Sequence, residues 1–227
     1  MYSTVILSFS DSRMKKYEDE FTDLPEDDKQ SRAVDLYFLN IDISSLFLAI
    51  SGVYEVLIRN AVVEVIEKKY GDRWFTNDTA FVRSIRGTRD RNRFCPKRHL
   101  RDVISKHGGE RGQIISNLKF AFWELILKPY QNQRLWSPFL VESFPRYRGE
   151  SEGLRAALEE HIRKVRRIRN RAAHHEPIYH LEELQSVVDE IFDVIGYRSP
   201  DLIDRLQPKR LKMQAYLERI RQKRQIA

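Results

Sequence analysis

The sequence contains a single cysteine, Cys95, and few residues that interrupt helices. One cysteine excludes an intrachain disulfide and a zinc site built from several thiolates, and it is compatible with a reducing compartment. Only 9 glycines and 8 prolines occur in 227 residues. Because these two residues punctuate loops and turns, their scarcity favours a helical protein.

Long apolar runs are also scarce. The longest candidate, Leu46 to Ile58, is short and contains Ser51, Gly52 and Glu55, so we expect that it does not span a bilayer. The first residues, MYSTVILSFSDSRMKK, have no cationic start before their apolar stretch and make a poor signal peptide. We therefore expect a soluble, cytoplasmic protein that has no membrane partner.

Positive charge, in contrast, is abundant and unevenly distributed. The formal net charge is +7 and the pI is about 9.5, a surplus that favours a polyanionic partner. Residues 18–28 are acidic, whereas the stretches 83–101, 163–171 and 205–224 are basic. Each basic stretch alone is more typical of a solvated face, but the three together point to nucleic acid. The candidate RNA-binding residues are Arg83, Arg86, Arg89, Arg91, Arg93, Arg163, Lys164, Arg166, Arg167, Arg171, Lys209 and Arg210.

Apolar residues recur at helical spacing along most of the chain. The pattern predicts an all-α fold of about nine helices, with no convincing strand. The expected helices cover residues 12–21, 27–40, 43–70, 81–85, 97–107, 151–175, 181–195, 202–206 and 211–220.

The length predicts a single domain over residues 1–227. We expect its core in 27–196, preceded by an N-terminal arm (1–26) and followed by a basic helical extension (197–227). The aromatic residues between 118 and 145 are expected mainly in the core, with a base-stacking platform as the minority interpretation.

The stretch VRRIRNRAAHHEPI, residues 165–178, ends an amphipathic helix in a crowd of cations and two adjacent histidines. Pro177 disfavours helical geometry at Glu176, so we expect the helix to end near His175. Asn170 and His174 share a helix face. Arg169 lies about 140° from His174 on an ideal helix, but its long side chain could still wrap toward the imidazole.

This combination of residues suits the cleavage of RNA. Arginine holds phosphate oxygens with a fixed fork of N–H groups, and histidine exchanges a proton near neutral pH. A base that removes the ribose 2′-hydroxyl proton and a cation that stabilises the phosphorane are sufficient without a metal. We therefore expect neither a metal nor another cofactor.

Simpler interpretations stay open. His174 could merely cap the end of the helix, since cations are favoured in the last turn. The Arg–His spacing alone is weak evidence, because Arg93/His99 and Arg101/His107 also fit it. His161 lies on the apolar stripe and is expected in the core.

Three segments in order resemble the Abi-like (abortive infection) family of the HEPN superfamily. RNRAAHHEPI (169–178) resembles its signature, and ISGVYEVLIRNAVVEVIEKKYGDRW (50–74) resembles its long helix. LKFAFWELILKPY followed by LWSPFLVESFP, within 118–145, resembles its aromatic segment, although Ala121 stands where the family often has glycine. The resemblance covers roughly residues 30–195.

This resemblance implies a HEPN-type multi-helix bundle that forms a homodimer with two Arg–His motifs facing one cleft. It also implies a metal-independent endoribonuclease that acts as a bacterial toxin in antiphage abortive infection or in a toxin–antitoxin system, restrained by a protein or RNA antitoxin. Arg169, Asn170 and His174 would be catalytic. His175, Glu176, Arg59 and Asn60 would support them.

Two other classes of function remain open. One is a non-catalytic RNA-binding module that holds a structured or small regulatory RNA. The other is a nucleotide-binding or protein-interaction domain that is partnered with a toxin or an antitoxin.

Overall fold

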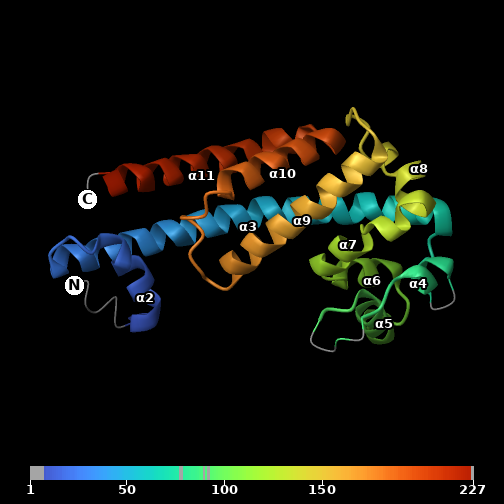
Figure 1. Cartoon of the computed structure of the whole chain (residues 1–227), viewed down its shortest axis with the longest axis horizontal. Helices are drawn as coiled ribbons and strands as arrows, with labels where there is room; N and C mark the ends of the chain where they lie inside the picture. The colour runs from blue at the N-terminus through green and yellow to red at the C-terminus, as the bar shows by residue number, and fades with distance from the viewer. Residues whose placement is uncertain (1–7, 77–78, 89, 91–92, 226–227) are drawn as a thin grey trace. The chain divides into compact units, whose positions relative to one another are not determined.

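The computed structural model describes residues 8–76, 79–88, 90 and 93–225, without the side chains of Pro138 and of 223–225. Over these ranges the chain forms helices and no strand, which confirms the all-α prediction. The α-helices are α2 (Asp11–Glu18), α3 (Glu26–Tyr70), α4 (Ala80–Ser84), α5 (Pro96–His107), α6 (Arg111–Asn117), α7 (Phe120–Ile126), α8 (Ser137–Phe139), α9 (Ser151–Ala173), α10 (Leu184–Arg198) and α11 (Asp201–Gln225) (Figure 1). Four short 3-10 or π turns accompany them: η1 (Asp19–Phe21), η2 (Pro129–Gln131), η3 (Asn132–Trp136) and η4 (Val141–Ser143).

Helix α3 replaces the two helices predicted over 27–40 and 43–70. Asn40, where the first of these predicted helices ended, has a side chain that is 2 % exposed and accepts a hydrogen bond from the Ile178 N–H at 2.8 Å. Neither glycine nor proline lies between Asn40 and Ile43, so the backbone continues as a helix. The helix ends at Tyr70, and Gly71 follows with a φ of 78°, as expected for a glycine stop.

The C-terminal helices also differ from their predicted bounds: α10 begins and ends three residues later than predicted, and α11 is longer. Helix α10 continues past Gly196 to Arg198. A Cβ added to Gly196 would come within 3.2 Å of the Ile203 Cδ1 atom. Helix α11 joins the two predicted segments 202–206 and 211–220 through Pro208, which lies inside the helix. Pro208 and Asp204 are both exposed, so water can satisfy the Asp204 carbonyl that proline leaves without its helical partner.

The chain divides into two compact units. The first unit contains residues 1–51, 168–189 and 204–227, and the second contains 52–167 and 190–203. The predicted arm and extension contribute buried side chains to the first unit, including Met14, Tyr17 and Met213. The prediction of one domain over the whole chain stays a prediction.

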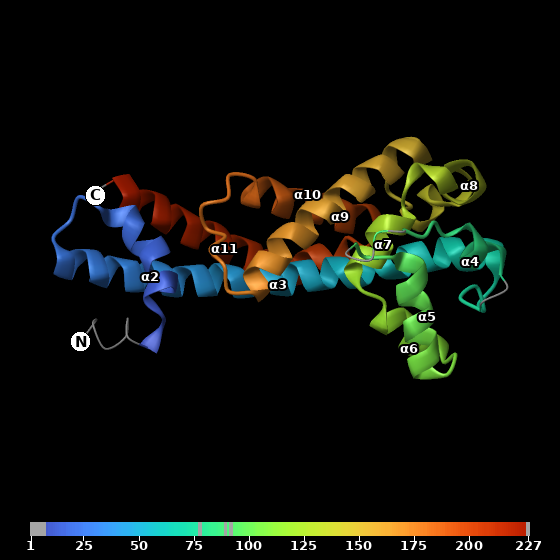
Figure 2. The same ribbon diagram turned by 60° about the horizontal axis from the view of Figure 1, so that its bottom comes forward.

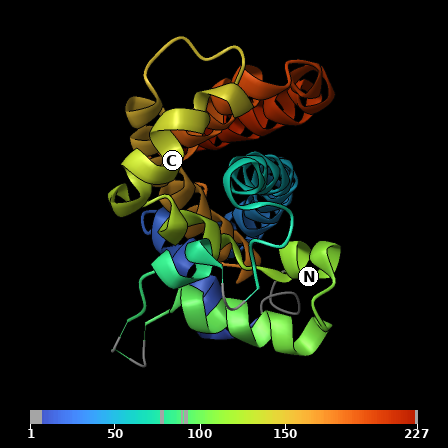
Figure 3. The same ribbon diagram turned by 90° about the vertical axis from the view of Figure 1, so that its right-hand side faces the viewer.

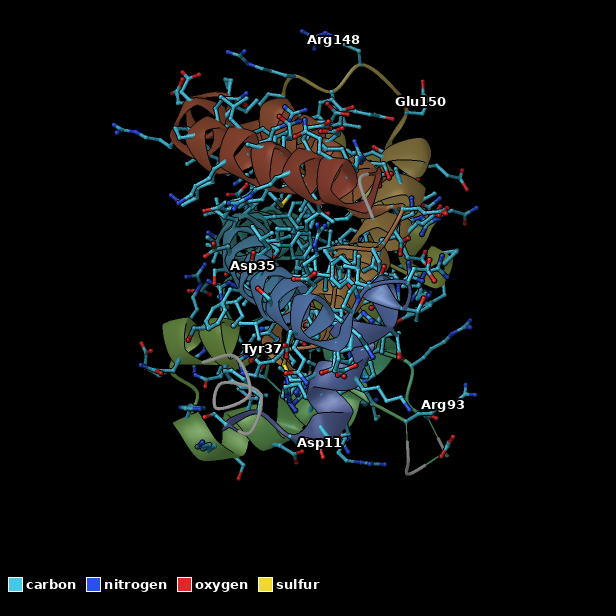
Figure 4. The ribbon with its side chains drawn as sticks, turned by 90° about the vertical axis from the view of Figure 1, so that its left-hand side faces the viewer. Asp11, Asp35, Tyr37, Arg93, Arg148 and Glu150 are labelled. Atoms are coloured by element: carbon cyan, nitrogen blue, oxygen red, sulfur yellow. The ribbon has the colours of Figure 1, made fainter. Side chains whose placement is uncertain are left out.

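Aromatic side chains dominate the core of the second unit. Trp74, Trp123 and Trp136 are all 0 % exposed, as is Phe144. Of the aromatic residues that the sequence placed in the core, Phe120, Phe122, Trp123, Trp136 and Phe144 are buried. Helices α5 and α6 pack against each other at one side of this unit (Figures 2 and 3). The exposed Arg148 and Glu150 lie on the loop before α9 (Figure 4).

In the described chain, α3 alone is long and apolar enough to cross a membrane by length and composition. This longer helix contains the run Leu46 to Ile58, which we expected to be too short to span a bilayer. The core helix of a water-soluble protein passes the same test, and 44 % of the apolar window is buried inside the structure.

Candidate functional site at the end of helix α9

The backbone at the end of α9 forms a Schellman motif. The Glu176 N–H bonds to the Arg171 carbonyl at 2.9 Å, and the His175 N–H bonds to the Ala172 carbonyl at 3.1 Å. The helix ends at Ala173 and turns at His174 and His175, which confirms the predicted end near His175. Both histidine side chains are exposed.

His175 occupies the position of this motif where glycine is usual. Its φ is 57°, and it is the only non-glycine residue with positive φ in the described chain. A left-handed conformation costs a residue with a Cβ on the order of 1–2 kcal/mol, so surrounding contacts have to hold it in place.

Three residues of the first unit, Arg13, Arg171 and Asn40, hold this turn. The Arg13 guanidinium on α2 donates to the His175 carbonyl at 3.0 Å. Arg171 donates to the Pro177 carbonyl at 2.9 Å and forms an ion pair with Glu176 at 3.3 Å. The buried Asn40 holds Ile178 immediately beyond. The turn is therefore fixed from α2, from α3 and from α9 itself.

The predicted catalytic residues all lie in the first unit. Arg169 and Asn170 are half-buried, and an Nη atom of Arg169 donates to the Asn170 Oδ1 atom at 3.3 Å. His174 is exposed one turn further along. Arg59 and Asn60 belong to the second unit, so the residues assigned to one cleft are divided between the two units.

A cavity of about 160 Å³ opens beside the two histidines, and we call it the histidine cavity. It is lined by His174, His175, Glu176 and Pro177 from the end of α9, and by Ser10, Ser12, Arg13, Lys16 and Tyr17 from α2 and the residues before it. The described lining includes neither Arg169 nor Asn170. Burial raises the pKa of Tyr17 to about 12, so its hydroxyl stays protonated at neutral pH.

Sequence reasoning missed Arg13 and Lys16. They stand about 160 positions from the histidines, and only the packing of α2 brings them there. The one signal was the basic run in MYSTVILSFSDSRMKK, which is ambiguous because lysines in the last turn of a helix also stabilise its end.

Many of the predicted RNA-binding residues form ion pairs within the protein. Lys164 pairs with Glu190 at 3.1 Å, and Arg166 pairs with Glu124 at 2.7 Å. Arg210 pairs with Asp189 at 2.6 Å, and Arg93 pairs with Asp90 at 3.3 Å. Arg83, Arg86, Arg163, Arg167 and Lys209 are exposed, while Arg89 and Arg91 lie outside the described residues.

A second, larger cavity lies in the second unit beside the basic segment 83–101. Its volume is about 690 Å³, and Arg86, Arg93, Phe94, Lys128 and Tyr130 are among its lining residues. The Arg86 guanidinium lies over the Tyr130 ring, 4.7 Å from its centroid. This volume falls within the range of roughly 300–1,000 Å³ that is usual for small-ligand sites.

His161 is a core residue, as the sequence predicted. It is 3 % exposed, and its Nδ1 atom lies 2.9 Å from the Tyr54 hydroxyl. Burial raises the pKa of Tyr54 well above its usual value, so this hydroxyl stays protonated, and the tautomer of His161 decides which of the two groups donates.

Among the described residues, no group of three or more histidine, cysteine, aspartate or glutamate side chains is arranged to hold a metal ion. Comparison with protein-family models, with curated proteins and with solved structures gives no match for this chain.

Proposed function

We propose that this protein is a metal-independent endoribonuclease of the HEPN type, which acts as a toxin in bacterial antiphage defence or in a toxin–antitoxin system. The observation that carries the proposal is the end of α9, where His174 stands exposed in a turn fixed by Arg13, Arg171 and Asn40. A histidine that only capped its helix would not require neighbouring elements to fix the turn around it. The resemblance of RNRAAHHEPI to the Abi-like signature points to the same chemistry.

In this mechanism the His174 imidazole accepts the proton of a ribose 2′-hydroxyl. The 2′-oxygen attacks the adjacent phosphorus, and the bond to the 5′-oxygen breaks as that oxygen takes up a proton from solvent. The products are a 2′,3′-cyclic phosphate and a 5′-hydroxyl. Arg169, held by Asn170, stabilises the extra negative charge on the phosphorane.

The second unit supplies further support for an RNA substrate. Its larger cavity combines exposed cations with the rings of Phe94 and Tyr130. Stacking on aromatic rings and contacts to the phosphate backbone are the two interactions that hold single-stranded RNA without sequence preference.

The test is RNA cleavage by the purified protein in the presence of EDTA. We expect cleavage with 2′,3′-cyclic phosphate ends, and a loss of about 10²–10⁴-fold in rate for His174→Ala, which is the usual contribution of a general base. His107→Ala is the matched control, because His107 also ends a helix but lies in α5. Folding of each variant is checked by circular dichroism. Equal cleavage by His174→Ala and His107→Ala would remove His174 from the mechanism.

Growth of bacteria that express the protein from an inducible promoter tests the toxin assignment. We expect growth arrest with the wild type and with His107→Ala, but not with Arg169→Ala or His174→Ala. Arrest with all four proteins would separate toxicity from cleavage.

A non-catalytic RNA-binding module is the second candidate. The separation of Arg169 from the histidine cavity favours it, since the arginine hydrogen-bonds to Asn170 and is not part of the described lining. RNA that co-purifies intact and stays uncut over hours would support this candidate against the nuclease.

A further inference from the structure

We propose that the histidine cavity binds a phosphate group of the RNA chain, and that Arg13 and Lys16 of α2 are its phosphate-binding residues. This inference rests on the proposed function, because it names how the substrate of the same site is held. It assigns a binding role to the N-terminal helix, which sequence reasoning placed in an arm outside the core.

The charge of the cavity favours an anion. Arg13 and Lys16 contribute two positive charges to the lining, and Glu176 contributes one negative charge. The Glu176 carboxylate is already paired with Arg171 at 3.3 Å, so its charge is largely compensated. His174 and His175 add N–H donors to the lining.

The α2 side of the cavity, like the α9 side, carries hydrogen-bond donors. One N–H of the Arg13 guanidinium is used by the His175 carbonyl at 3.0 Å, and arginine has five such donors. The Ser10 and Ser12 hydroxyls lie 3.3 Å apart, and the Ser10 side chain makes no capping hydrogen bond to α2. These groups suit the several oxygens of a phosphate, which accepts multiple charge-assisted hydrogen bonds.

The volume of the cavity determines which part of the RNA can enter it. About 160 Å³ exceeds the roughly 10–15 Å³ needed for one water molecule, so a phosphate group can enter. It is well below the roughly 300 Å³ at which sites for small molecules begin, so a nucleoside does not fit beside the phosphate. The sugar and the base must therefore remain outside, as they would for one phosphate of a longer chain.

Arg13 has a second task in this arrangement. Its bond to the His175 carbonyl links α2 to the left-handed residue, so the residue that binds phosphate also fixes the turn that carries the imidazoles. Lys16 has no such structural contact among those described and is exposed, which makes it the cleaner probe of phosphate binding.

Titration with inorganic phosphate, followed by NMR of the histidine ring protons, tests the site without requiring any cleavage. We expect phosphate to shift the His174 and His175 resonances in the wild type. In Lys16→Gln the apparent affinity should fall at least about tenfold, the equivalent of one charge-assisted hydrogen bond. The matched control is Lys15→Gln, which removes the neighbouring exposed lysine of the same helix but no lining residue, and it should match the wild type.

A short 2′-deoxy oligonucleotide cannot be cleaved by attack of a 2′-hydroxyl, and it tests whether the cavity binds a phosphate within a nucleic-acid chain. It should bind more tightly than a mononucleotide and lose affinity in Lys16→Gln but not in Lys15→Gln. A mononucleotide that binds as tightly as the oligonucleotide would assign the cavity to a free nucleotide and overturn the proposal. Arg13→Gln should weaken phosphate binding as well, and if it fails to fold, the comparison of the two lysine variants still decides.

The two proposals fail differently. Phosphate shifts at His174 with no RNA cleavage would retain the phosphate site and remove the nuclease. Cleavage in Lys16→Gln with an unchanged KM, or equal phosphate affinity in the two lysine variants, would retain the nuclease and overturn the role of α2. An adventitious ion that binds at other histidines would leave the His174 and His175 resonances unmoved, which also overturns it.

Discussion

At the scale of single residues, the position of His175 carries a cost that the sequence does not reveal. The Schellman motif demands a positive φ at this position, and glycine meets that demand without strain. Histidine is several-fold enriched among the few non-glycine residues that adopt this conformation, but it still gives up some stability there. Its presence is consistent with a side chain that is retained for its chemistry.

Substitution of His175 measures this cost. We expect His175→Gly to have a free energy of unfolding about 1 kcal/mol higher than His175→Ala, because alanine keeps the Cβ that opposes positive φ. Urea denaturation of the two variants gives the difference. The control is Ala173→Gly, which changes the last residue of α9 and should lower the stability by at most about 0.5–1 kcal/mol. A lower stability for His175→Gly than for His175→Ala would contradict the backbone described here.

Asn40 is the residue on which the sequence prediction of α3 failed. Its side chain accepts a buried hydrogen bond from the Ile178 N–H, and α3 continues through it. Such partners come from sequence positions far away, so no local pattern predicts them. For this reason the sequence predicted neither the continuation of α3 through Asn40 nor the hydrogen bond by which Asn40 holds Ile178.

Asn40→Ala should leave the Ile178 N–H buried without a partner and lower the free energy of unfolding by about 1–3 kcal/mol. Asn60→Ala is the control, because Asn60 lies on the same helix but is exposed. Both changes gain the same helix propensity, so the difference between them isolates the hydrogen bond. Equal denaturation midpoints with equal slopes would contradict the contact.

His99 provides the pH dependence that the structure supports. Burial lowers the pKa of His99, and the positive charge of Lys119 lowers it further, against an opposing effect of Asp102. The Nε2 atom accepts a hydrogen bond from the Lys119 N–H at 3.1 Å, which requires the neutral ring. The unfolded chain therefore binds the proton more readily than the folded one.

The direction in which stability changes with pH follows from this difference in proton affinity. The contribution of His99 to stability is fully present above its ordinary pKa of about 6.5 and is lost as the pH falls toward the lowered folded value. We expect His99→Gln to lose stability less steeply than the wild type over this interval, measured by urea denaturation across pH. A wild-type slope in His99→Gln would rule out this coupling.

At the scale of elements, the presence of the helices was predictable, but the positions of their boundaries were not. The stripe of Leu154, Leu158, Val165 and Ile168 on α9 is fully buried, as its spacing indicated. The predicted interruptions between residues 40 and 43 and between 206 and 211 were wrong, because α3 and α11 continue through them. Intrinsic propensities of single residues amount to a few kcal/mol at most, and packing along the rest of a long helix overrides them.

Pro208 shows how large this local penalty is. We expect Pro208→Ala to raise the free energy of unfolding by about 1–3 kcal/mol, because alanine restores the hydrogen bond to the Asp204 carbonyl in an exposed helix interior. Thermal denaturation, followed by circular dichroism, measures the change. Lys209→Ala, at the next exposed position, should differ from the wild type by no more than about 0.5 kcal/mol. No gain in Pro208→Ala would show that α11 does not continue through this residue.

At the scale of the whole molecule, the site residues fall into two groups that the sequence could not sort. The arginine–histidine motif was visible because its members are neighbours in one helix. The contributions of Arg13 and Lys16 were not, because they depend on the packing of α2 against the end of α9. Likewise, the sequence counted cations but could not tell exposed ones, such as Arg86, from those that form ion pairs, such as Arg166.

A dimer would resolve the separation between Arg169 and the histidine cavity. In one chain Arg169 bonds to its neighbour Asn170 and is not part of the described lining of the cavity. If two α9 helices face each other across a twofold axis, the arginine of one chain can approach the histidine of the other. The catalytic pair would then be formed between chains, which predicts complementation.

Arg169→Ala and His174→Ala should each be inactive alone, and cleavage should return when the two variants are co-expressed and purified as a mixed dimer. In that dimer one chain supplies the histidine and the other supplies the arginine, so one working pair is formed. The control is His174→Ala combined with the double variant Arg169→Ala/His174→Ala, which has no histidine and should stay inactive. Size-exclusion chromatography with light scattering verifies that every preparation is dimeric. If mixed dimers form without cleavage while the wild type cuts RNA, each chain must assemble its own pair, and Arg169 must reach His174 by a rearrangement within the last turns of α9.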